Sequence, residues 1–191
     1  MRVLSVNIGG ARPLRAGGRT VLSAIGKRAV DGTVEVGALG LAGDEQADLS
    51  VHGGLHKAVY AYPAEHYPMW HEARRAAGVS LFDEALPWGF LGENLSIEGL
   101  IESGVWVGDR LQFPHCTLRV TAPREPCFKF TEVMGFSAAA RLMVQQAACG
   151  FYLAVEVPGT LSAGEHFTVQ PGPRGLTISD AFLARKVKHL R

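Results

Sequence analysis

The chain has 191 residues, 47% of them hydrophobic, which is enough to bury the core of one domain. Its formal net charge of +1 gives no strong field to recruit nucleic acid or an anionic membrane. No apolar run is long enough to cross a bilayer, and the start MRVLSVNIGG lacks the apolar core of a signal peptide. We therefore expect a soluble, cytoplasmic protein that binds neither nucleic acid nor membrane.

The first half of the chain alternates between apolar runs and glycine-rich turns. Strands are predicted over residues 2–8, 20–25, 33–36 and 58–62. The basic stretch 11–20 is predicted to be an exposed loop, and most of the glycine-rich stretch after Gly40 is predicted to be loop as well. A helix is expected from Pro63 to Ala77, which Pro68 should kink or split in two.

The second half repeats this pattern with two helices. Strands are predicted over residues 105–107, 110–113, 118–122, 151–157 and 166–169. Ser137 can cap a helix that runs to Ala147, and Thr177 or Ser179 can open a last amphipathic helix. About ten short strands with few helices favour a mainly β (α+β) fold. We expect a twisted, closed or nearly closed β-barrel with a few peripheral helices, because closure hides strand edges.

Three cysteines, Cys116, Cys127 and Cys149, are odd in number and show no Cys-x-x-Cys spacing, so neither a disulfide framework nor a structural zinc site is expected. Cys127 differs from the other two because it follows two prolines and has Arg124 and Lys129 as close neighbours in sequence. Cations favour the thiolate, which is both the nucleophile and the soft metal ligand. A buried structural cysteine is the alternative interpretation.

Two loops carry further candidate ligand-binding residues. In the segment HGGLHK, Gly53 and Gly54 allow backbone N–H groups to approach a ligand closely, and His52 and Lys57 add donors beside them. This suits an anionic or polar cofactor, although a simple turn before a buried strand explains the glycines equally well. The segment GENL could present Asn94 as a positioning amide, a weak signal because asparagine is common in turns.

A spacing of four separates Asp44, Asp48, His52 and His56, which on a helix would align a divalent-metal site. The glycines at 43, 53 and 54 make a continuous helix there unfavourable, so we do not expect these four residues to bind a metal ion together.

Four motifs, in this order, resemble the MOSC domains, named after the C-terminal domain of molybdenum cofactor sulfurases. They are GLAGDEQAD, HGGLHKAVYAYPAEHY, GFLGENLSIEGL with VGDRL, and PREPCFKF, and the resemblance covers about residues 36–170. The branch most similar is the small stand-alone bacterial type called YiiM. The resemblance implies a MOSC β-barrel over residues 1–170, and leaves a C-terminal helical tail over residues 171–191. That tail is shorter than the helical module in which chains of this branch usually end.

The resemblance also implies a molybdenum–pterin cofactor and one cysteine that either ligates molybdenum or carries sulfur. Here that cysteine is Cys127, with Arg124 and Lys129 as its basic flank and His52 as the donor of the HGG loop. The branch is associated with reduction of N-hydroxylated bases and related compounds. Such a role implies a small N-hydroxylated substrate, an electron-donor reductase and possible donors of sulfur or cofactor. A persulfide carrier and a cofactor carrier without turnover remain open alternatives.

Overall fold

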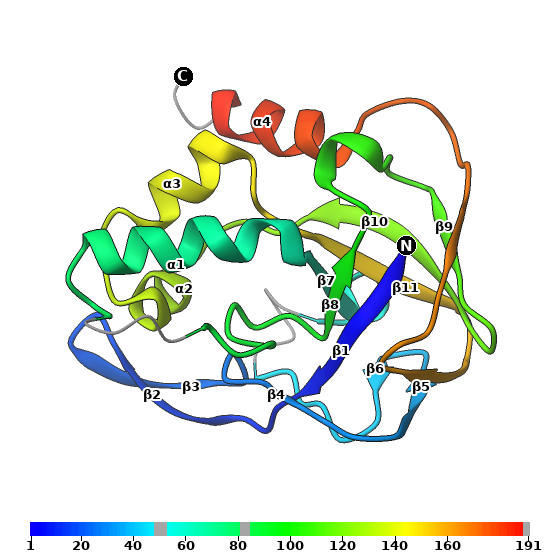
Figure 1. Ribbon diagram of the computed structural model, residues 1–191, viewed down its shortest axis with the longest axis horizontal. Coiled ribbons are helices and arrows are strands. Elements are labelled where there is room, and N and C mark those ends of the chain that lie inside the picture. The colour runs from blue at the N-terminus through cyan, green and yellow to red at the C-terminus, as the bar shows by residue number, and fades with distance from the viewer. Residues whose placement is uncertain (48–52, 81–84, 189–191) are drawn as a thin grey trace.

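The computed structural model describes residues 1–47, 53–80 and 85–188, and Figure 1 shows a layer of strands with helices gathered at one side. The strands are β1 (Arg2–Ile8), β2 (Arg12–Ala16), β3 (Arg19–Ser23), β4 (Arg28–Ala29), β5 (Thr33–Gly37), β6 (Gly40–Leu41), β7 (Val59–Pro63), β8 (Leu95–Glu98), β9 (Arg110–Gln112), β10 (Thr117–Pro123), β11 (Phe151–Val157), β12 (Gly159–Ser162) and β13 (Thr168–Gln170). The helices are α1 (Tyr67–Ala76), α2 (Phe128–Met134), α3 (Ala139–Gln146) and α4 (Ile178–Lys188), with short 3-10 turns at Leu55–Lys57, Ala64–His66 and Glu102–Gly104.

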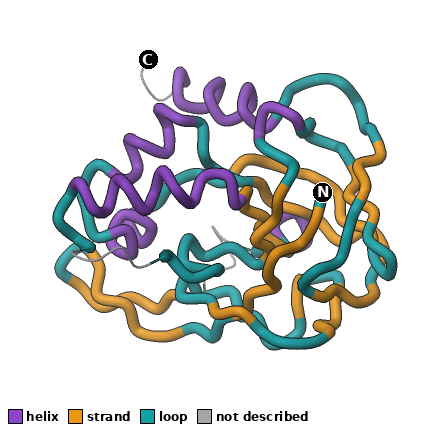
Figure 2. Tube along the Cα trace, in the orientation of Figure 1, coloured by secondary structure: helices purple, strands orange, loops and turns teal. Residues whose placement is uncertain are grey.

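Eight strands form the main sheet in the order β13-β9-β10-β11-β7-β8-β1-β4. A three-stranded sheet, β12-β5-β6, and the separate β2–β3 hairpin complete the strands (Figure 2). All five residues of β7 are buried, as expected for a central strand covered on both faces. The pairing of β7 with β8 is parallel, whereas the other named pairs among the described strands are antiparallel.

The two ends of the main sheet approach each other through β1. The backbone N–H of Val3 donates to the carbonyl of Glu165 at 2.9 Å, and Arg2 forms an isolated bridge with His166. The predicted mixed class, mainly sheet with a few helices, is confirmed. A fully closed barrel, one of the two predicted forms, is not found among the described strands. Residues 164–167, just before β13, bond to residues 1–3 through three backbone hydrogen bonds and one isolated bridge, without a continuous strand pairing.

The helices pack on the sheet and complete one core. Trp70 of α1, Phe130 of α2, Met143 of α3 and Phe182 of α4 are fully buried in the same cluster. No helix in the described part of the chain is long and apolar enough to span a bilayer.

Several predicted elements have different bounds in the structure. Pro68 does split the predicted helix, because α1 begins at Tyr67 after a 3-10 turn and Pro68 occupies its first turn, where no N–H is needed. The basic loop over residues 11–20 is wrong, since it contains most of the β2–β3 hairpin. The strand predicted over residues 105–107 is also wrong, because Trp106 forms only an isolated bridge with Thr177.

Candidate functional site

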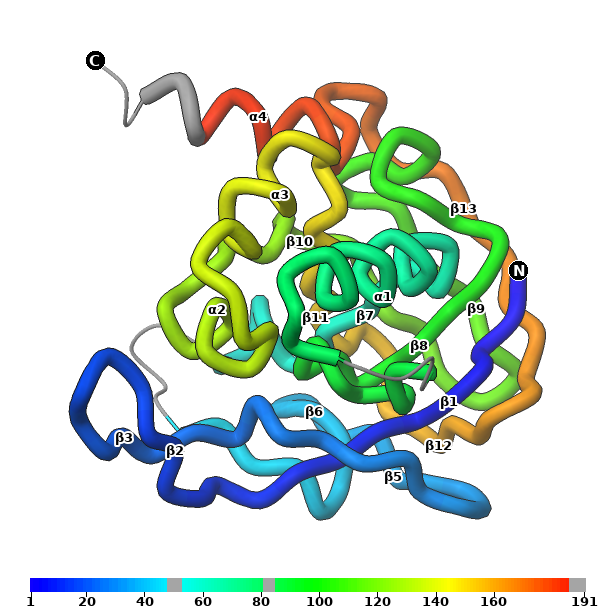
Figure 3. The backbone as a smooth tube through the Cα atoms, turned by 60° about the vertical axis from the view of Figure 1, so that its left-hand side comes forward, coloured from blue at the N-terminus to red at the C-terminus, as the bar shows by residue number. Residues whose placement is uncertain are grey.

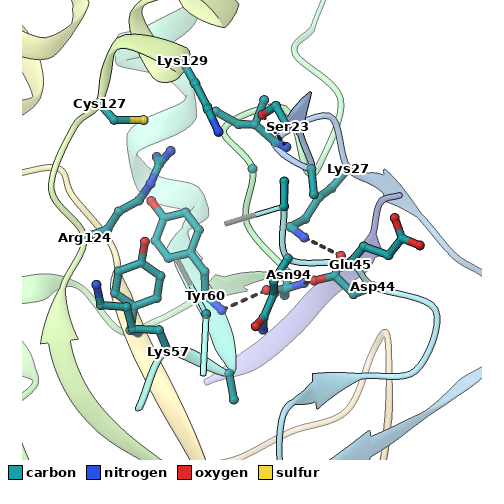
Figure 4. A pocket seen from close by; sticks show the side chains of 18 residues that line it. Ser23, Lys27, Asp44, Glu45, Lys57, Tyr60, Asn94, Arg124, Cys127 and Lys129 are labelled. Carbon is teal, nitrogen blue, oxygen red and sulfur yellow. Dashed lines mark hydrogen bonds and ion pairs between the residues drawn. The ribbon is translucent and has the colours of Figure 1, made fainter. Parts of the chain in front are cut away.

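One cavity gathers residues from distant parts of the chain (Figure 4). It contains about 640 Å³ of space between atoms, a volume that includes open solvent. Its lining consists of Ser23, Ala24, Ile25, Lys27, Asp44, Glu45, Gln46, Ala47, Gly53, Lys57, Ala58, Tyr60, Gly92, Asn94, Arg124, Cys127, Lys129 and Tyr152.

The cysteine loop forms one wall of this cavity. The strand β10 ends at Pro123, which pairs with Phe151 of β11, so the chain leaves the sheet where Arg124 begins. Cys127 has an extended backbone and caps α2, accepting the N–H of Phe130 at its carbonyl at 3.0 Å. Its thiol is half-buried and lines the cavity. The loop therefore presents sulfur at a fixed point between a strand and a helix.

Arg124 lies almost completely buried behind this sulfur, with only 5% of its surface exposed. Its guanidinium stacks over the rings of Tyr60 at 4.9 Å and Phe130 at 5.2 Å. Within the described part of the chain, its Nη1 atom has no hydrogen-bond partner. Buried polar groups are rarely left unsatisfied, so this nitrogen is available to a ligand.

The cation is retained despite its burial. Burial alone lowers the pKa of the Arg124 guanidinium, but Tyr60, Tyr152 and Cys127 raise it above the usual arginine range. Burial in turn raises the pKa of both tyrosine hydroxyls, so they remain protonated near neutral pH. Figure 4 shows the guanidinium pointing toward the sulfur of Cys127. The wall thus combines a permanent positive charge with an accessible thiol.

The opposite wall contains a buried ion pair between Lys27 and Asp44, whose side chains are 8% and 5% exposed. The carboxylate of Asp44 also accepts the backbone N–H of Gly9 at 2.9 Å and the amide of Asn94 at 2.9 Å. Burial lowers the pKa of Lys27, and Asp44 only partly offsets this effect. The cavity is therefore polar on both sides, with its charges held by fixed partners.

Asn94 is held in place by the strands around it. Its Oδ1 accepts the backbone N–H of Tyr60 at 3.0 Å, and its Nδ2 donates to the carbonyl of Asn7 at 3.2 Å as well as to Asp44. Both amide hydrogens are therefore used within the protein. The predicted positioning amide does line the cavity, and what it positions in this structure is the carboxylate of Asp44.

The neighbouring Glu93 shapes the loop that carries Asn94. Its fully buried carboxylate accepts the N–H groups of Gly89 at 2.8 Å and Leu91 at 3.1 Å, and the hydroxyls of Ser96 and Tyr67. Burial raises the pKa of Glu93, while these donors act in the opposite direction. The Glu93 side chain of the Gly-Glu-Asn sequence therefore fixes the conformation of the loop.

The glycine loop contributes one of its two described glycines to the cavity lining. Gly53 lines the cavity with φ +107°, and a Cβ there would lie 2.0 Å from Oε1 of Gln46. Gly54 is not among the lining residues, and its N–H donates to that same oxygen at 3.1 Å. The predicted donor His52 lies outside the described residues.

The two predicted lysines lie on different sides of the cavity. Lys57 places its ammonium 5.5 Å from the ring centre of Tyr152. Lys129 reaches across to donate to the carbonyl of Leu22 at 3.0 Å, so it joins the cysteine wall to β3. Both line the cavity together with Cys127.

Of the four residues at spacing four, Asp48 and His52 lie outside the described residues. Asp44 belongs to the ion pair with Lys27, and His56 lies in a 3-10 turn with its carbonyl accepting the hydroxyl of Thr121 at 2.6 Å. Within the described ranges, no group of three or more His, Cys, Asp or Glu side chains could hold a metal ion.

The sequence interpretation missed three prominent residues of the site. Tyr60 and Tyr152 were assigned only to buried strands, yet they pair across β7 and β11 with ring centres 5.5 Å apart and form the cavity floor. Lys27 was given no role. Nothing near it in sequence indicates the long-range partner Asp44.

Comparison with known proteins identifies a family for this chain. The family model described as MOSC domain matches residues 48–168. The chain belongs to the MOSC domain family. It is 37% identical to Protein YiiM of Escherichia coli (strain K12) over 83% of this chain and 69% of that protein. A crystal structure of YiiM from Geobacillus stearothermophilus superposes with a TM-score of 0.77 at 26% identity, covering 98% of this chain and 84% of that one.

A third relative carries a functional name. The chain is 31% identical to a protein named Reductase from Gibberella moniliformis (strain M3125 / FGSC 7600), over 97% of this chain. It spans only 33% of that longer protein.

Proposed function

We propose that this MOSC protein binds a molybdenum–pterin cofactor in the cavity, with Cys127 as a ligand to the metal, and reduces small N-hydroxylated compounds. One observation carries the proposal: a half-buried thiol faces a buried cation whose Nη1 has no partner among the described residues. Association of the MOSC family with the molybdenum cofactor, and a relative named Reductase, support the same assignment.

The donor set fits such a group. A pterin cofactor carries an anionic phosphate and polar ring edges, which require cations and hydrogen-bond donors. Arg124 offers a free Nη1, and Lys57 and Lys129 add ammonium groups on the same lining. A thiolate is a suitable soft ligand, and Cys127 is the cysteine on this lining.

Each wall has its own task in this mechanism. Arg124 stabilises negative charge on the Cys127 sulfur, since the two interact electrostatically across the cavity wall. Asn94 and Lys27 hold Asp44 in one orientation, which gives the substrate a fixed acceptor. The chemistry that bound molybdenum would supply is the acceptance of an oxygen atom from an N–OH group. The electrons would come from a separate reductase.

A second candidate follows from the accessibility of Cys127. Cys116 and Cys149 are 3% and 0% exposed, which leaves Cys127 as the accessible thiol among three. A thiol of this kind could carry persulfide sulfur, or the cavity could hold and deliver the cofactor without turnover, with sulfur or cofactor supplied by a donor protein.

The deciding experiment measures metal, sulfur and turnover on one preparation. Protein from a molybdate-replete host is analysed for molybdenum and for cyanide-releasable sulfur, and is assayed for reduction of an N-hydroxylated base with a chemical reductant. Bound molybdenum with turnover supports the reductase. Molybdenum without turnover supports a carrier, and releasable sulfur without molybdenum supports persulfide transfer. Cys127→Ser should lose the molybdenum and keep the fold, because the prolines shape the loop.

A further inference from the structure

The β2–β3 hairpin is a cationic ribbon attached to a nearly neutral protein. Between Gly10 and Val30 the chain has four arginines and one lysine and no acidic residue, although its overall net charge is only +1. The lysine, Lys27, is paired with Asp44. The four arginines, Arg12, Arg15, Arg19 and Arg28, are exposed and have no ion-pair partner among the described residues. Three of them, Arg12, Arg15 and Arg19, lie on the hairpin and Arg28 lies in β4, so positive charge is concentrated in this part of the chain.

The two faces of the hairpin have different environments. Residues that pair across an antiparallel ribbon share a face. The pair Leu14 and Val21 is half-buried toward the protein, whereas the pair Pro13 and Leu22 is exposed. Leu22 is 54% exposed and shares the outer face with Arg15, whereas Arg12 and Arg19 are in register with the inner face and are exposed at opposite ends of the hairpin. The hairpin therefore presents exposed apolar and basic side chains together.

The Arg19 end of the hairpin adjoins the wall of the cavity. Figure 3 shows the hairpin beside α2, and the guanidinium of Arg19 lies 5.6 Å from the ring centre of Phe128. Phe128 is 46% exposed and directly follows Cys127 in the chain. The ammonium of Lys129 bonds to the carbonyl of Leu22 at 3.0 Å. A partner that contacts Leu22 and Phe128 therefore lies within a few residues of the thiol.

We propose that the surface formed by Arg12, Arg15, Arg19, Leu22 and Phe128 is the docking site of an acidic electron-donor protein, which presents a reduced flavin or iron–sulfur cluster among carboxylates. This proposal rests on the proposed reductase function. The step needs two electrons, delivered together by a reduced flavin or one at a time by two successive iron–sulfur donor molecules, which with two protons from solvent convert N–OH to N–H and release one water. Complementary charge steers such transient encounters, while exposed apolar and aromatic residues supply the contact.

Nucleic acid is the less favoured partner for this face. Three arginines on one short hairpin give few phosphate contacts, and nucleic-acid affinity depends on their number. The exposed apolar side chains of Leu22 and Phe128 fit a protein surface better.

The test measures binding of a plant-type [2Fe–2S] ferredoxin, a small acidic donor, by calorimetry. We expect salt-sensitive binding that weakens several-fold between about 20 and about 200 mM NaCl, as screening of exposed charges requires. The triple variant Arg12→Glu/Arg15→Glu/Arg19→Glu should bind about tenfold more weakly or not at all. The matched control Arg141→Glu reverses an exposed arginine on α3, which Figures 1 and 3 place far from the hairpin, and should bind like the wild type.

Two further measurements separate this proposal from the proposed function. Dithionite-driven reduction by cofactor-loaded protein should be equal in the wild type and the triple variant, whereas ferredoxin-driven reduction should fall with the binding. Absence of dithionite-driven turnover would refute the reductase assignment, whatever binds. Equal ferredoxin binding by wild type and triple variant, no ferredoxin binding at all, or tighter binding of a DNA duplex through the same arginines would refute the docking site.

Discussion

Lys27 and Asp44 form an ion pair across one wall of the cavity, although their side chains are only 8% and 5% exposed. The carboxylate has two further donors, the backbone of Gly9 and the amide of Asn94, whereas no donor or acceptor other than Asp44 is seen for the ammonium within the described residues. Lys27 therefore depends on Asp44 to remain charged while it is buried.

Removing the lysine should be costly, because it leaves a buried carboxylate with less compensation. We expect Lys27→Met to lower the free energy of unfolding by about 3 kcal/mol or more. Denaturant unfolding measures this directly. The double variant Lys27→Met/Asp44→Asn should be less destabilised than the sum of the single variants, and strict additivity would show that the two residues do not interact.

The same pair predicts a dependence on pH. Burial lowers the pKa of Lys27 in the folded state below its ordinary value of 10.5. At pH values between the folded-state pKa and 10.5, the unfolded state therefore binds more protons than the folded state. The contribution of Lys27 to the free energy of unfolding should then rise with pH toward 10.5. The free energies of unfolding of the wild type and of Lys27→Met, plotted against pH, should diverge in that window. Parallel curves would contradict the lowered pKa.

Arg124 should matter more for ligand binding than for stability. Its Nη1 has no partner in the described part of the chain, so Arg124→Met removes a buried charge without breaking a hydrogen bond at that atom. We expect the melting temperature of cofactor-free protein to stay within a few degrees or to rise. Molybdenum retention should fall strongly. As a control, Lys129→Met should leave more molybdenum bound, because its ammonium already bonds to Leu22. A large stability loss in Arg124→Met would make Arg124 a structural residue.

Thiol labelling distinguishes the three cysteines within one sample. Burial raises the pKa of Cys116 to about 12 and raises that of Cys149 as well, and both side chains are almost inaccessible. Iodoacetamide at about pH 6.5 should therefore modify Cys127 first in the folded, cofactor-free protein, and bound cofactor should protect it. Mass spectrometry of the digested protein shows the order in which the three cysteines are modified. Faster labelling of Cys116 or Cys149 would contradict the role assigned to Cys127.

Two glycines in the left-handed region allow a matched test of packing behind the site. A Cβ on Gly150, at φ +62°, would lie 2.5 Å from the carbonyl oxygen of Ala61, whereas a Cβ on Gly18, at φ +75°, would meet nothing within 4 Å. Gly18→Ala should cost roughly 1 kcal/mol, the penalty of the backbone conformation alone. Gly150→Ala should cost roughly 3 kcal/mol or more, because strand β7 must also move. Equal melting temperatures would contradict this packing.

Local patterns predicted much of the strand framework. The alternation of apolar residues gave β1 and β11 with their observed bounds, and β10 stops at Pro123 as the prolines required. Thr177 caps α4 by accepting the N–H of Asp180 at 3.0 Å. These features depend on neighbours in sequence, so sequence alone reveals them.

The parts that were missed depend on distant partners. Strand β2 and the turn after it were predicted to be loop, because arginines and glycines conceal a strand with only one half-buried face. Gly53, Asn94 and Cys127, all named from the sequence, line the same cavity. The charge on its opposite wall could not be predicted, since nothing near Lys27 in sequence indicates Asp44.

The parallel pairing of β7 with β8 has a consequence for how the cavity is assembled. Parallel neighbours need a long crossover, and here the chain passes from Pro63 to Leu95 before Asn94 can receive the N–H of Tyr60. Pairings that close long loops form slowly, because the chain loses entropy before contacts repay it. We expect the Asn94 wall to be among the last parts to fold. Nascent chains would then carry an incomplete cavity, and any ligand of this cavity would bind only after the sheet has formed.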